Sequence, residues 1–397
     1  MSSLSEAQLH VSAENPDNAM NLKFEVSPNE IIEKLLEVID LTASKEHKQH
    51  IIQGIFNNII LKLEDAKFSN VRVIRNNPIV TAQDNFDNLL FPAGNPGRSS
   101  TYTRYVDDNH VLRTHTSAII PSLFRELSKE SLPPASTYVM PGLVYRRDVI
   151  DPRHLDVFHQ IDVWTLCTKE LYELSREDLL ELVNVVFTAA CPGAEMIYYE
   201  AKHPYTNKGI EVYARINGRD IEVLECGIIH PEVLEKSGID SKKFTGLALG
   251  MGLERLIMAR KDLPDIRLIR SGDPRIVKQM SNLERYVQVS DMPPVSRDIS
   301  YATLKTNTEE DICEDIKDAF GNSSHLLEEV IILERIAHEN LHPKAQDKLG
   351  TDPRMDNILA RVILRHPDVT LTKESANEMY RLAYPKIHKG SNSGYTE

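Results

Sequence analysis

The chain has 397 residues, a hydrophobic content of 41% and a formal net charge of −13. This length allows two domains with a substantial core, and the acidic balance excludes a uniformly basic nucleic-acid-binding surface while leaving room for a local basic patch. No apolar run is long enough to span a membrane. The first residues lack the apolar core of a secretion signal and the arginine-rich character of a transit peptide, so we expect a cytoplasmic protein.

In chain order, the pattern predicts four stretches. Residues 1–25 are polar and are expected to form a disordered tail, whereas residues 26–70 have helical spacing of apolar residues, notably over Lys48–Leu63. Residues 71–283 mix strands with an amphipathic helix near Leu171–Ala189, which is typical of an α+β domain built on an antiparallel sheet. A linker is expected near Arg270–Asn282.

Residues 284–390 form the last predicted domain. Their pattern predicts a strand from Pro293, a helix over Glu309–Ala319, two strands and a final helix over Lys373–Ala383. This order fits a ferredoxin-like unit whose last strand is weak or missing. Leu341–Met355 reads as an inserted polar loop.

The most informative segment runs from Val144 to Trp164. Val144–Asp148 and Val157–Trp164 predict two antiparallel strands, and Asp151–Arg153 supplies turn-forming residues between them. Burying so many unpaired charges in a core would be too costly. The polar face of this hairpin must therefore meet water or a charged ligand.

A second segment, Gly246–Leu256, begins with small residues and continues with helical periodicity. Its glycines permit a close backbone approach, and Arg255 falls in the first turns of the expected helix. Together with Arg146 on the hairpin, Arg255 suits a polyphosphate, because the guanidinium is always charged and binds phosphate oxygens in a bidentate manner.

These two segments resemble the second and third motifs of the class II aminoacyl-tRNA synthetases, and their details resemble the phenylalanyl-tRNA synthetase family. The resemblance covers residues 77–386 and includes several further segments: Asp84–Leu90, Pro96–Arg98, Leu112–Ala118, Phe158–Gln160 and Ile221–Leu224. It implies a class II catalytic domain followed by a ferredoxin-like anticodon-binding domain, in the single-chain arrangement found in organelles. It also implies aminoacyl-adenylate formation from ATP, with Mg2+, and transfer to tRNA.

The resemblance assigns an ATP-binding set. Arg146 matches the arginine that contacts the α-phosphate and the substrate carboxylate, and Arg255 matches the arginine on the γ-phosphate; both are the expected catalytic residues. Asp148 would meet the adenine amino group, and Glu222 would hold Mg2+. His154 near the phosphates and Phe158 stacked on adenine complete this set.

The amino-acid side departs from the family. His115 and Ser117 match its carboxylate- and amine-facing pair, and Gln160 and Asp162 match the residues that bind the α-amino group. Two positions differ: Asp162 replaces a glutamate of the family, and Ile120 replaces a glutamine. The family's Phe-Pro-Phe clasp is replaced around His203 and Tyr205, a glycine is replaced by Glu225, and the third motif contributes Ala248 and Leu249, the latter in place of phenylalanine.

A carboxylate in this pocket must be paired or protonated. Glu225 could be satisfied by Tyr205 or His203 alone, or it could recognise a polar substituent on the substrate. The second possibility leads to the prediction that phenylalanine is not the best substrate and that a more polar analogue is preferred.

Other functions remain open. An amino-acid-activating paralogue could pass its acyl group to an acceptor other than tRNA, and a regulatory protein could keep the fold without turnover. A small metal site is a further alternative, although alternation along the strand separates His159 from the other potential ligands, His154, Asp156 and Asp162. No membrane partner is expected, and a monomer is favoured.

Overall fold

The computed structural model describes residues 30–43, 49–66, 68, 70–129, 132–289, 292–366 and 369–392. The tail predicted over residues 1–25 lies outside these ranges. Contacts divide the chain into two compact units. We call them the N-terminal unit (residues 1–146, 157–263 and 268–286) and the C-terminal unit (residues 147–156, 264–267 and 287–397).

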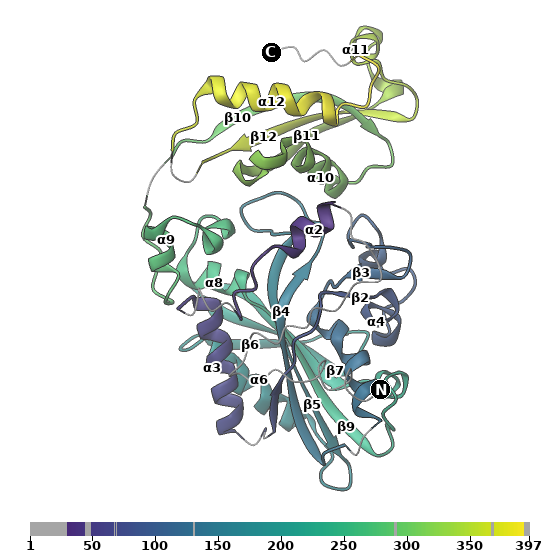
Figure 1. Ribbon diagram of the computed structural model, residues 1–397, viewed down its shortest axis with the longest axis vertical. Coiled ribbons are helices and arrows are strands. Elements are labelled where there is room, and N and C mark those ends of the chain that lie inside the picture. The colour runs from purple at the N-terminus through teal and green to yellow at the C-terminus, as the bar shows by residue number, and fades with distance from the viewer. Residues whose placement is uncertain are drawn as a thin grey trace. The chain divides into compact units, whose positions relative to one another are not determined.

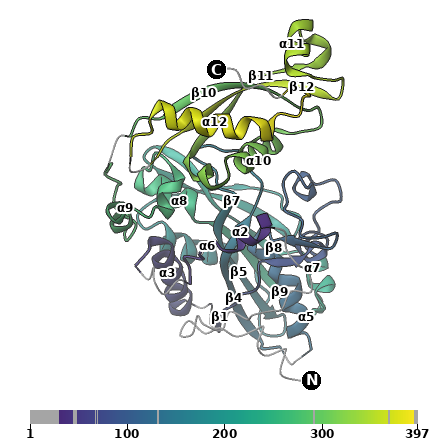
Figure 2. The same cartoon turned by 45° about the horizontal axis from the view of Figure 1, so that its top comes forward.

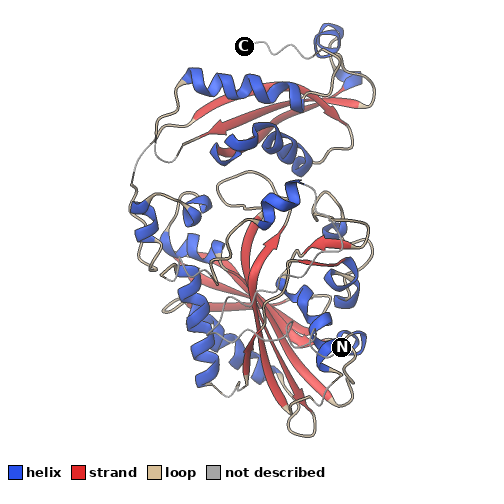
Figure 3. Cartoon of the chain, viewed as in Figure 1, coloured by secondary structure: helices blue, strands red, loops and turns tan. Residues whose placement is uncertain are grey.

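A seven-stranded sheet forms the centre of the N-terminal unit (Figures 1 and 3). Its order is β1-β4-β5-β9-β8-β7-β6, and every neighbouring pair is antiparallel except β1 and β4. A separate two-stranded sheet pairs β2 (Ile79–Thr81) with β3 (His110–Leu112). The main strands are β1 (Val71–Val73), β4 (Ala135–Tyr145), β5 (Val157–Thr168), β6 (Glu195–Glu200), β7 (Thr206–Ile216), β8 (Arg219–Ile229) and β9 (Phe244–Gly252).

The predicted hairpin is confirmed as β4 and β5, which pair from Ala135↔Cys167 to Tyr145↔Val157. The prediction placed the first strand too late, because β4 ends at Tyr145 and the chain leaves the sheet before Asp148. Two further strands of the expected antiparallel sheet are β7 and β8, which pair with each other.

Helices pack on this sheet in positions close to those predicted. The amphipathic helices α3 (Ile51–Asp65) and α6 (Arg176–Ala190) lie side by side (Figure 2). α6 begins later than predicted because Ser175 and Asp178 form a capping box that satisfies the first free N–H groups. Among the described residues of this unit, the remaining α-helices are α2 (Glu30–Leu36), α4 (Ala82–Asn85), α5 (Ile120–Leu127), α7 (Pro231–Lys236), α8 (Glu254–Lys261) and α9 (Pro274–Gln279). α9 falls within the predicted linker.

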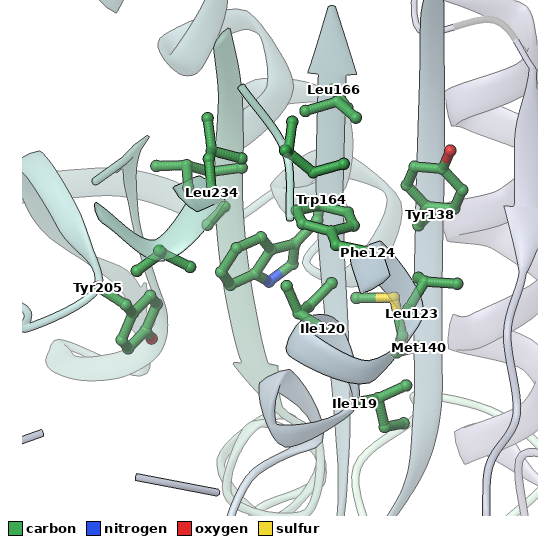
Figure 4. Close-up of a cluster of buried hydrophobic side chains, with 14 of the residues drawn as sticks. Ile119, Ile120, Leu123, Phe124, Tyr138, Met140, Trp164, Leu166, Tyr205 and Leu234 are labelled. Atoms are coloured by element: carbon green, nitrogen blue, oxygen red, sulfur yellow. The ribbon is translucent and has the colours of Figure 1, made fainter. Parts of the chain in front are cut away.

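An apolar cluster fills the space between the sheet and the helices α5 and α7. Trp164 lies at its centre, edge-on to Phe124 and stacked on Tyr205, with ring centroids 6.2 and 5.9 Å apart (Figure 4). Burial of aromatic rings of this size contributes several kcal/mol to folding (~25 cal/mol per Å2 of buried apolar surface). The cluster therefore provides a rigid wall on this side of the sheet.

Gly142 in β4 is expected to be irreplaceable. Its φ is +154°, and a Cβ at this position would collide with the guanidinium of Arg113, a buried side chain whose Nε donates to the Leu143 carbonyl at 2.7 Å. We expect Gly142→Ala to lower the free energy of unfolding by about 2–4 kcal/mol, from backbone strain and the displaced buried cation. Urea unfolding tests this, with Gly54→Ala in α3 as the control, because its Cβ would enter open space. An equal effect of the two substitutions would contradict the prediction.

The C-terminal unit contains a three-stranded antiparallel sheet of order β10-β12-β11. Along the chain the order is strand, helix, strand, strand, helix, with a short additional helix before the third strand. The predicted polar loop at Leu341–Met355 is wrong in part, because Pro343–Leu349 is helical. The elements are β10 (Val295–Leu304), α10 (Glu309–Phe320), β11 (Leu327–Ala337), α11 (Pro343–Leu349), β12 (Met355–Leu364) and α12 (Lys373–Ile387).

Residues 147–156, which connect β4 to β5, group with the C-terminal unit. The Val330 N–H donates to the Ile150 carbonyl at 3.0 Å, Arg147 pairs with Asp311 at 3.0 Å, and Asp156 pairs with Lys317. No local pattern indicates this grouping, since it depends on contacts between residues more than a hundred positions apart in the chain.

The four cysteines, Cys167, Cys191, Cys226 and Cys313, are free and buried. Among the described residues, no helix has the length and apolar character required to cross a membrane.

Candidate active site

The centre of the candidate site is a floor of small residues on β9. Gly250 pairs with Asp162 on one side and with Glu225 on the other, so these two acidic residues flank a strand position that has no side chain. Gly252 pairs with Gln160, and Ala248 pairs with Trp164 in the same way. Side chains alternate between the faces of a sheet, so all of these residues lie on one face.

Asp162 is the most enclosed acid of this floor, with 3% of its surface exposed. Its carboxylate accepts hydrogen bonds from the Thr116 hydroxyl at 2.5 Å and from the Trp164 indole N–H at 3.0 Å. Burial raises the pKa of Asp162 to about 6, an effect that these hydrogen bonds partly offset and the charge of Glu225 reinforces. Thr116 also donates its backbone N–H to Gln160 Oε1 at 3.2 Å.

Three residues predicted for the pocket wall, Tyr205, His203 and Glu225, lie together. The Tyr205 hydroxyl donates to Glu225 Oε1 at 2.8 Å, and His203 Nε2 lies 3.4 Å from Glu225 Oε2. Burial and the neighbouring charge of Glu225 raise the pKa of Tyr205 well above its usual value. Glu225 therefore finds partners within the protein, which was one of the two possibilities left open by the sequence.

His115 faces the same space from the segment before α5. Its ring stacks on Phe91 at a centroid distance of 5.2 Å, and its Nδ1 is hydrogen-bonded to the Ser117 hydroxyl at 2.8 Å. Burial, followed by the charge of Arg146, lowers the pKa of His115 to about 3. The imidazole is therefore neutral near pH 7 and can act as a hydrogen-bonding group but not as a cation.

Arg146 lies directly after β4. Its guanidinium carbon is 5.0 Å from the centre of the Phe158 ring and 5.8 Å from that of Tyr102, while its Nε donates to the Thr114 carbonyl at 2.9 Å. Contact with two aromatic faces orients the planar guanidinium and limits its freedom. The arrangement holds a fixed positive charge at the end of the hairpin where β4 leaves the sheet.

A β-bulge brings Glu222 to the same face as Glu225. Val223 is the extra residue, because Leu224 pairs with Val212 and Glu222 with Tyr213. Without this bulge, side chains three positions apart on a strand would point to opposite faces. Lost hydration and the neighbouring acids Glu211 and Glu225 raise the pKa of Glu222, whereas the charge of Arg255 opposes the shift.

These acids suit a magnesium ion whose remaining coordination positions would be filled by a bound ligand and water. Carboxylate oxygens suit Mg2+, which commonly takes only one or two of them and fills its octahedron with waters and phosphate oxygens. Among the described residues, no group of three His, Cys, Asp or Glu side chains is placed to hold a metal by itself. This finding also removes support for the alternative metal site built around His154 and Asp162.

Three predicted residues are not among those on this face of the N-terminal sheet. Leu249 pairs with Val163 and Cys226 on the opposite face of the sheet, so we do not carry it into the proposal. Asp148 and His154 belong to the C-terminal unit, where His154 Nδ1 is 2.8 Å from both carboxylate oxygens of Asp151. The predicted turn is present there, since Asp151 also accepts the Arg153 N–H at 2.6 Å.

Several residues of the site were missed from the sequence. Trp164 could have been found, because alternation along the strand places it on the face of Asp162 two positions away. Phe91 reaches the site from a loop and Thr116 from the start of a short 3-10 helix, and no periodicity reveals either conformation. Glu211 depends on strand pairing with Glu225 across the β7–β8 register.

Comparison with known proteins identifies the family to which the chain belongs. Residues 38–280 match the family described as tRNA synthetases class II core domain (F). The chloroplastic/mitochondrial phenylalanine–tRNA ligase of Arabidopsis thaliana is 29% identical over 377 residues, which are 92% of this chain and 82% of that protein. A phenylalanine–tRNA ligase alpha subunit of Prochlorococcus marinus is 39% identical over 49% of this chain, which spans only 56% of that subunit.

The chain therefore belongs to the class II tRNA synthetases, in the branch of the phenylalanine enzymes. A pyrrolysyl-tRNA synthetase structure from Desulfitobacterium hafniense also aligns, with 18% identity over 60% of this chain and 77% of that one and a TM-score of 0.44.

Proposed function

We propose that the protein activates an aromatic amino acid with ATP, releasing pyrophosphate, and transfers the aminoacyl group to a tRNA. Phenylalanine is proposed as the primary substrate, in place of the more polar analogue expected from the sequence, because the relatives are phenylalanine–tRNA ligases and Glu225 is already held by Tyr205. This proposal rests mainly on one observation: the polar side chains of Asp162 and Gln160, opposite Gly250 and Gly252, lie beside the stacked aromatic rings of Trp164 and Tyr205. The family relationship favours this reading over the paralogue with a different acceptor.

The amino acid would be bound by both of its charged ends. Its ammonium would lie against Asp162 and the Gln160 amide oxygen, while its ring would lie against the apolar cluster that contains Trp164. Neutral His115 would orient the substrate carboxylate without forming a competing ion pair. Glu225, held by Tyr205, replaces part of the apolar lining and would admit a more polar analogue as a second substrate.

Adenylate formation needs no general base, because the attacking carboxylate is already an anion. Its oxygen bonds to the α-phosphorus of ATP while the bond to the bridging oxygen breaks and pyrophosphate leaves. Arg146 would neutralise charge on the α-phosphate and Arg255 on the γ-phosphate, so catalysis rests on positioning and electrostatics. Glu222, with Glu211 or Glu225 nearby, would hold Mg2+, which neutralises the phosphate oxygens.

Asp148 and His154 are proposed, from the family resemblance, to complete the nucleotide site, and Phe158 to stack on adenine. The C-terminal unit is proposed to be a ferredoxin-like anticodon-binding domain covering residues 284–390, following a catalytic domain over residues 71–283. Support comes from the strand-helix-strand-strand-helix order and the strand order β10-β12-β11. A cytoplasmic location and a monomeric state remain predictions.

Amino-acid-dependent ATP–pyrophosphate exchange tests this function. We expect exchange with phenylalanine and its ring-hydroxylated or β-hydroxylated analogues, and little exchange with aliphatic amino acids. A second assay measures transfer of the activated amino acid to tRNA. Absence of exchange with every standard and modified amino acid would reject the proposal, while exchange without transfer would restore the alternative acceptor.

The affinity for the amino acid is expected to depend on pH through Asp162. The ammonium binds the ionised carboxylate, and the pKa of Asp162 is raised to about 6 in the free protein. As the pH falls below this value, protonation removes the binding form, so KM for the amino acid should rise about tenfold per pH unit. Exchange measured between pH 5 and 8 tests this prediction, with KM for ATP as the internal control. A constant amino-acid KM over this range would contradict it.

A further inference from the structure

A buried contact joins β5 to the first turn of α8. His159 and Glu254 expose 0% and 2% of their surfaces. Both oxygens of Glu254 lie 2.9 Å from the backbone nitrogen of His159, and one lies 2.6 Å from its ring Nδ1. The Leu253 N–H donates to the His159 carbonyl at 3.1 Å, so the chain on either side of the pair is held as well.

The protonation site of His159 follows from its other ring nitrogen. The backbone N–H of Leu41 donates to Nε2 at 2.9 Å, which requires a lone pair on that nitrogen. The ring proton therefore lies on Nδ1 and is donated to Glu254. The two residues before Leu41 are held in place: Arg270 donates to the carbonyl of Ile39 at 3.0 Å, and Arg75 pairs with Asp40 at 3.1 Å. Leu41 is therefore fixed as well.

Each residue of the pair precedes a residue of the proposed site. Gln160 follows His159 and is held independently by the pairing of β5 with β9. Arg255 follows Glu254 in α8, and the side chain of Arg255 is exposed. The N-cap residue of this helix, Leu253, makes no capping hydrogen bond through its side chain. The Glu254–His159 contact is thus a buried polar restraint on the part of α8 that carries Arg255, and Arg270 supports it with Nη2 4.0 Å from Glu254 Oε1 and 3.3 Å from His159 Nδ1.

We propose that His159 and Glu254 are positioning residues that fix Arg255 for the phosphates of ATP, with the Ile39–Thr42 segment holding His159 in the required tautomer. This inference rests on the proposed function. Misplacement of a charged group by about 1 Å can lower a rate by about 100-fold. Loss of the contact should therefore affect ATP more than the amino acid, since Gln160 keeps its place in the sheet.

Exchange kinetics of four variants test the inference. His159→Leu removes both ring nitrogens, Glu254→Gln removes the charge and one acceptor, and His159→Asn keeps an N–H donor near the position of Nδ1. Arg255→Ala removes the group being positioned. Val183→Ala, in the buried face of α6 and away from the site, controls for lost stability. Thermal unfolding is measured for every variant.

We expect His159→Leu and Glu254→Gln to raise KM for ATP or lower kcat by about 10- to 100-fold, with a change of less than about threefold in KM for the amino acid. His159→Asn should recover most of the loss. Combining His159→Leu with Arg255→Ala should cost little more than Arg255→Ala alone, because both changes act through one group.

Two results would overturn the inference: unchanged ATP kinetics in both single variants, or losses that multiply fully in the double variant. Reduced thermal stability with wild-type kinetic constants, as expected for Val183→Ala, would assign the pair a purely structural role. A wild-type protein without exchange activity would instead reject the proposed function, and binding of ATP to each variant would then decide the positioning role separately.

Discussion

Replacement of Arg146 by alanine is expected to reduce amino-acid-dependent pyrophosphate exchange by about 100- to 1,000-fold. The reacting carboxylate and the α-phosphate are both anionic, and loss of a preorganised positive group costs about 3–4 kcal/mol in comparable sites. Phe158 and Tyr102 hold the guanidinium in one orientation, so the group is in place before substrate arrives.

The Arg146 prediction can be checked against a matched variant. Arg215→Ala removes the same side chain from an exposed position on β7, where it pairs with Asp220 and Glu195, and should leave exchange close to the wild-type rate. Arg146→Lys keeps the charge but loses the planar, bidentate geometry and should recover only a minor part of the activity. Near-normal activity of Arg146→Ala would remove this residue from the proposed mechanism.

Replacement of Asp162 by asparagine has the second-largest expected effect. The variant loses the charge that would pair with the substrate ammonium, and a hydrogen bond to a charged group contributes about 1.5–3 kcal/mol. We therefore expect kcat/KM for the amino acid to fall by about 10- to 100-fold, while KM for ATP changes little. The rise in amino-acid KM at low pH should also disappear, since no carboxyl group remains to be protonated.

Asp220→Asn is the control for Asp162→Asn. It makes the same chemical change on β8 at an exposed residue that pairs with Arg215. Thermal unfolding should accompany both measurements, because the Trp164 indole loses an acceptor when Asp162 becomes an amide. A variant at position 162 with wild-type amino-acid kinetics would show that the ammonium binds elsewhere.

Much of the N-terminal unit could be predicted from local patterns. Alternation and turn residues located the β4–β5 hairpin, and helical spacing located α3 and α6, because each signal lies within a single element. Element ends were less accurate: the caps at Ser175 and the exit of the chain after Tyr145 depend on specific hydrogen bonds and on where strand pairing stops.

The site was only partly accessible from the sequence. Gln160 and Asp162 share a face by simple alternation, and in the structure both lie on β5 opposite glycines of β9. Leu249 was assigned from its position in a motif, although strand periodicity directs it to the opposite face from Ala248. The partners of Glu225 could not be chosen beforehand, because Tyr205 lies 20 residues away and reaches it only through the folded sheet.

The extra residue at Val223 has a consequence for relatives and for engineering. Deleting it would restore regular pairing and keep Glu222 opposite Tyr213, now two positions from Glu225 and on the same face. One residue inserted in β7 opposite Val223 would instead pair the extra residue and turn Glu222, with every residue of β8 before it, to the other side of the sheet. A homologue with such an insertion could retain the same acidic letter in an alignment while pointing it away from the proposed nucleotide site. Insertions opposite the bulge therefore change side-chain orientation, and a shared column does not guarantee a shared role.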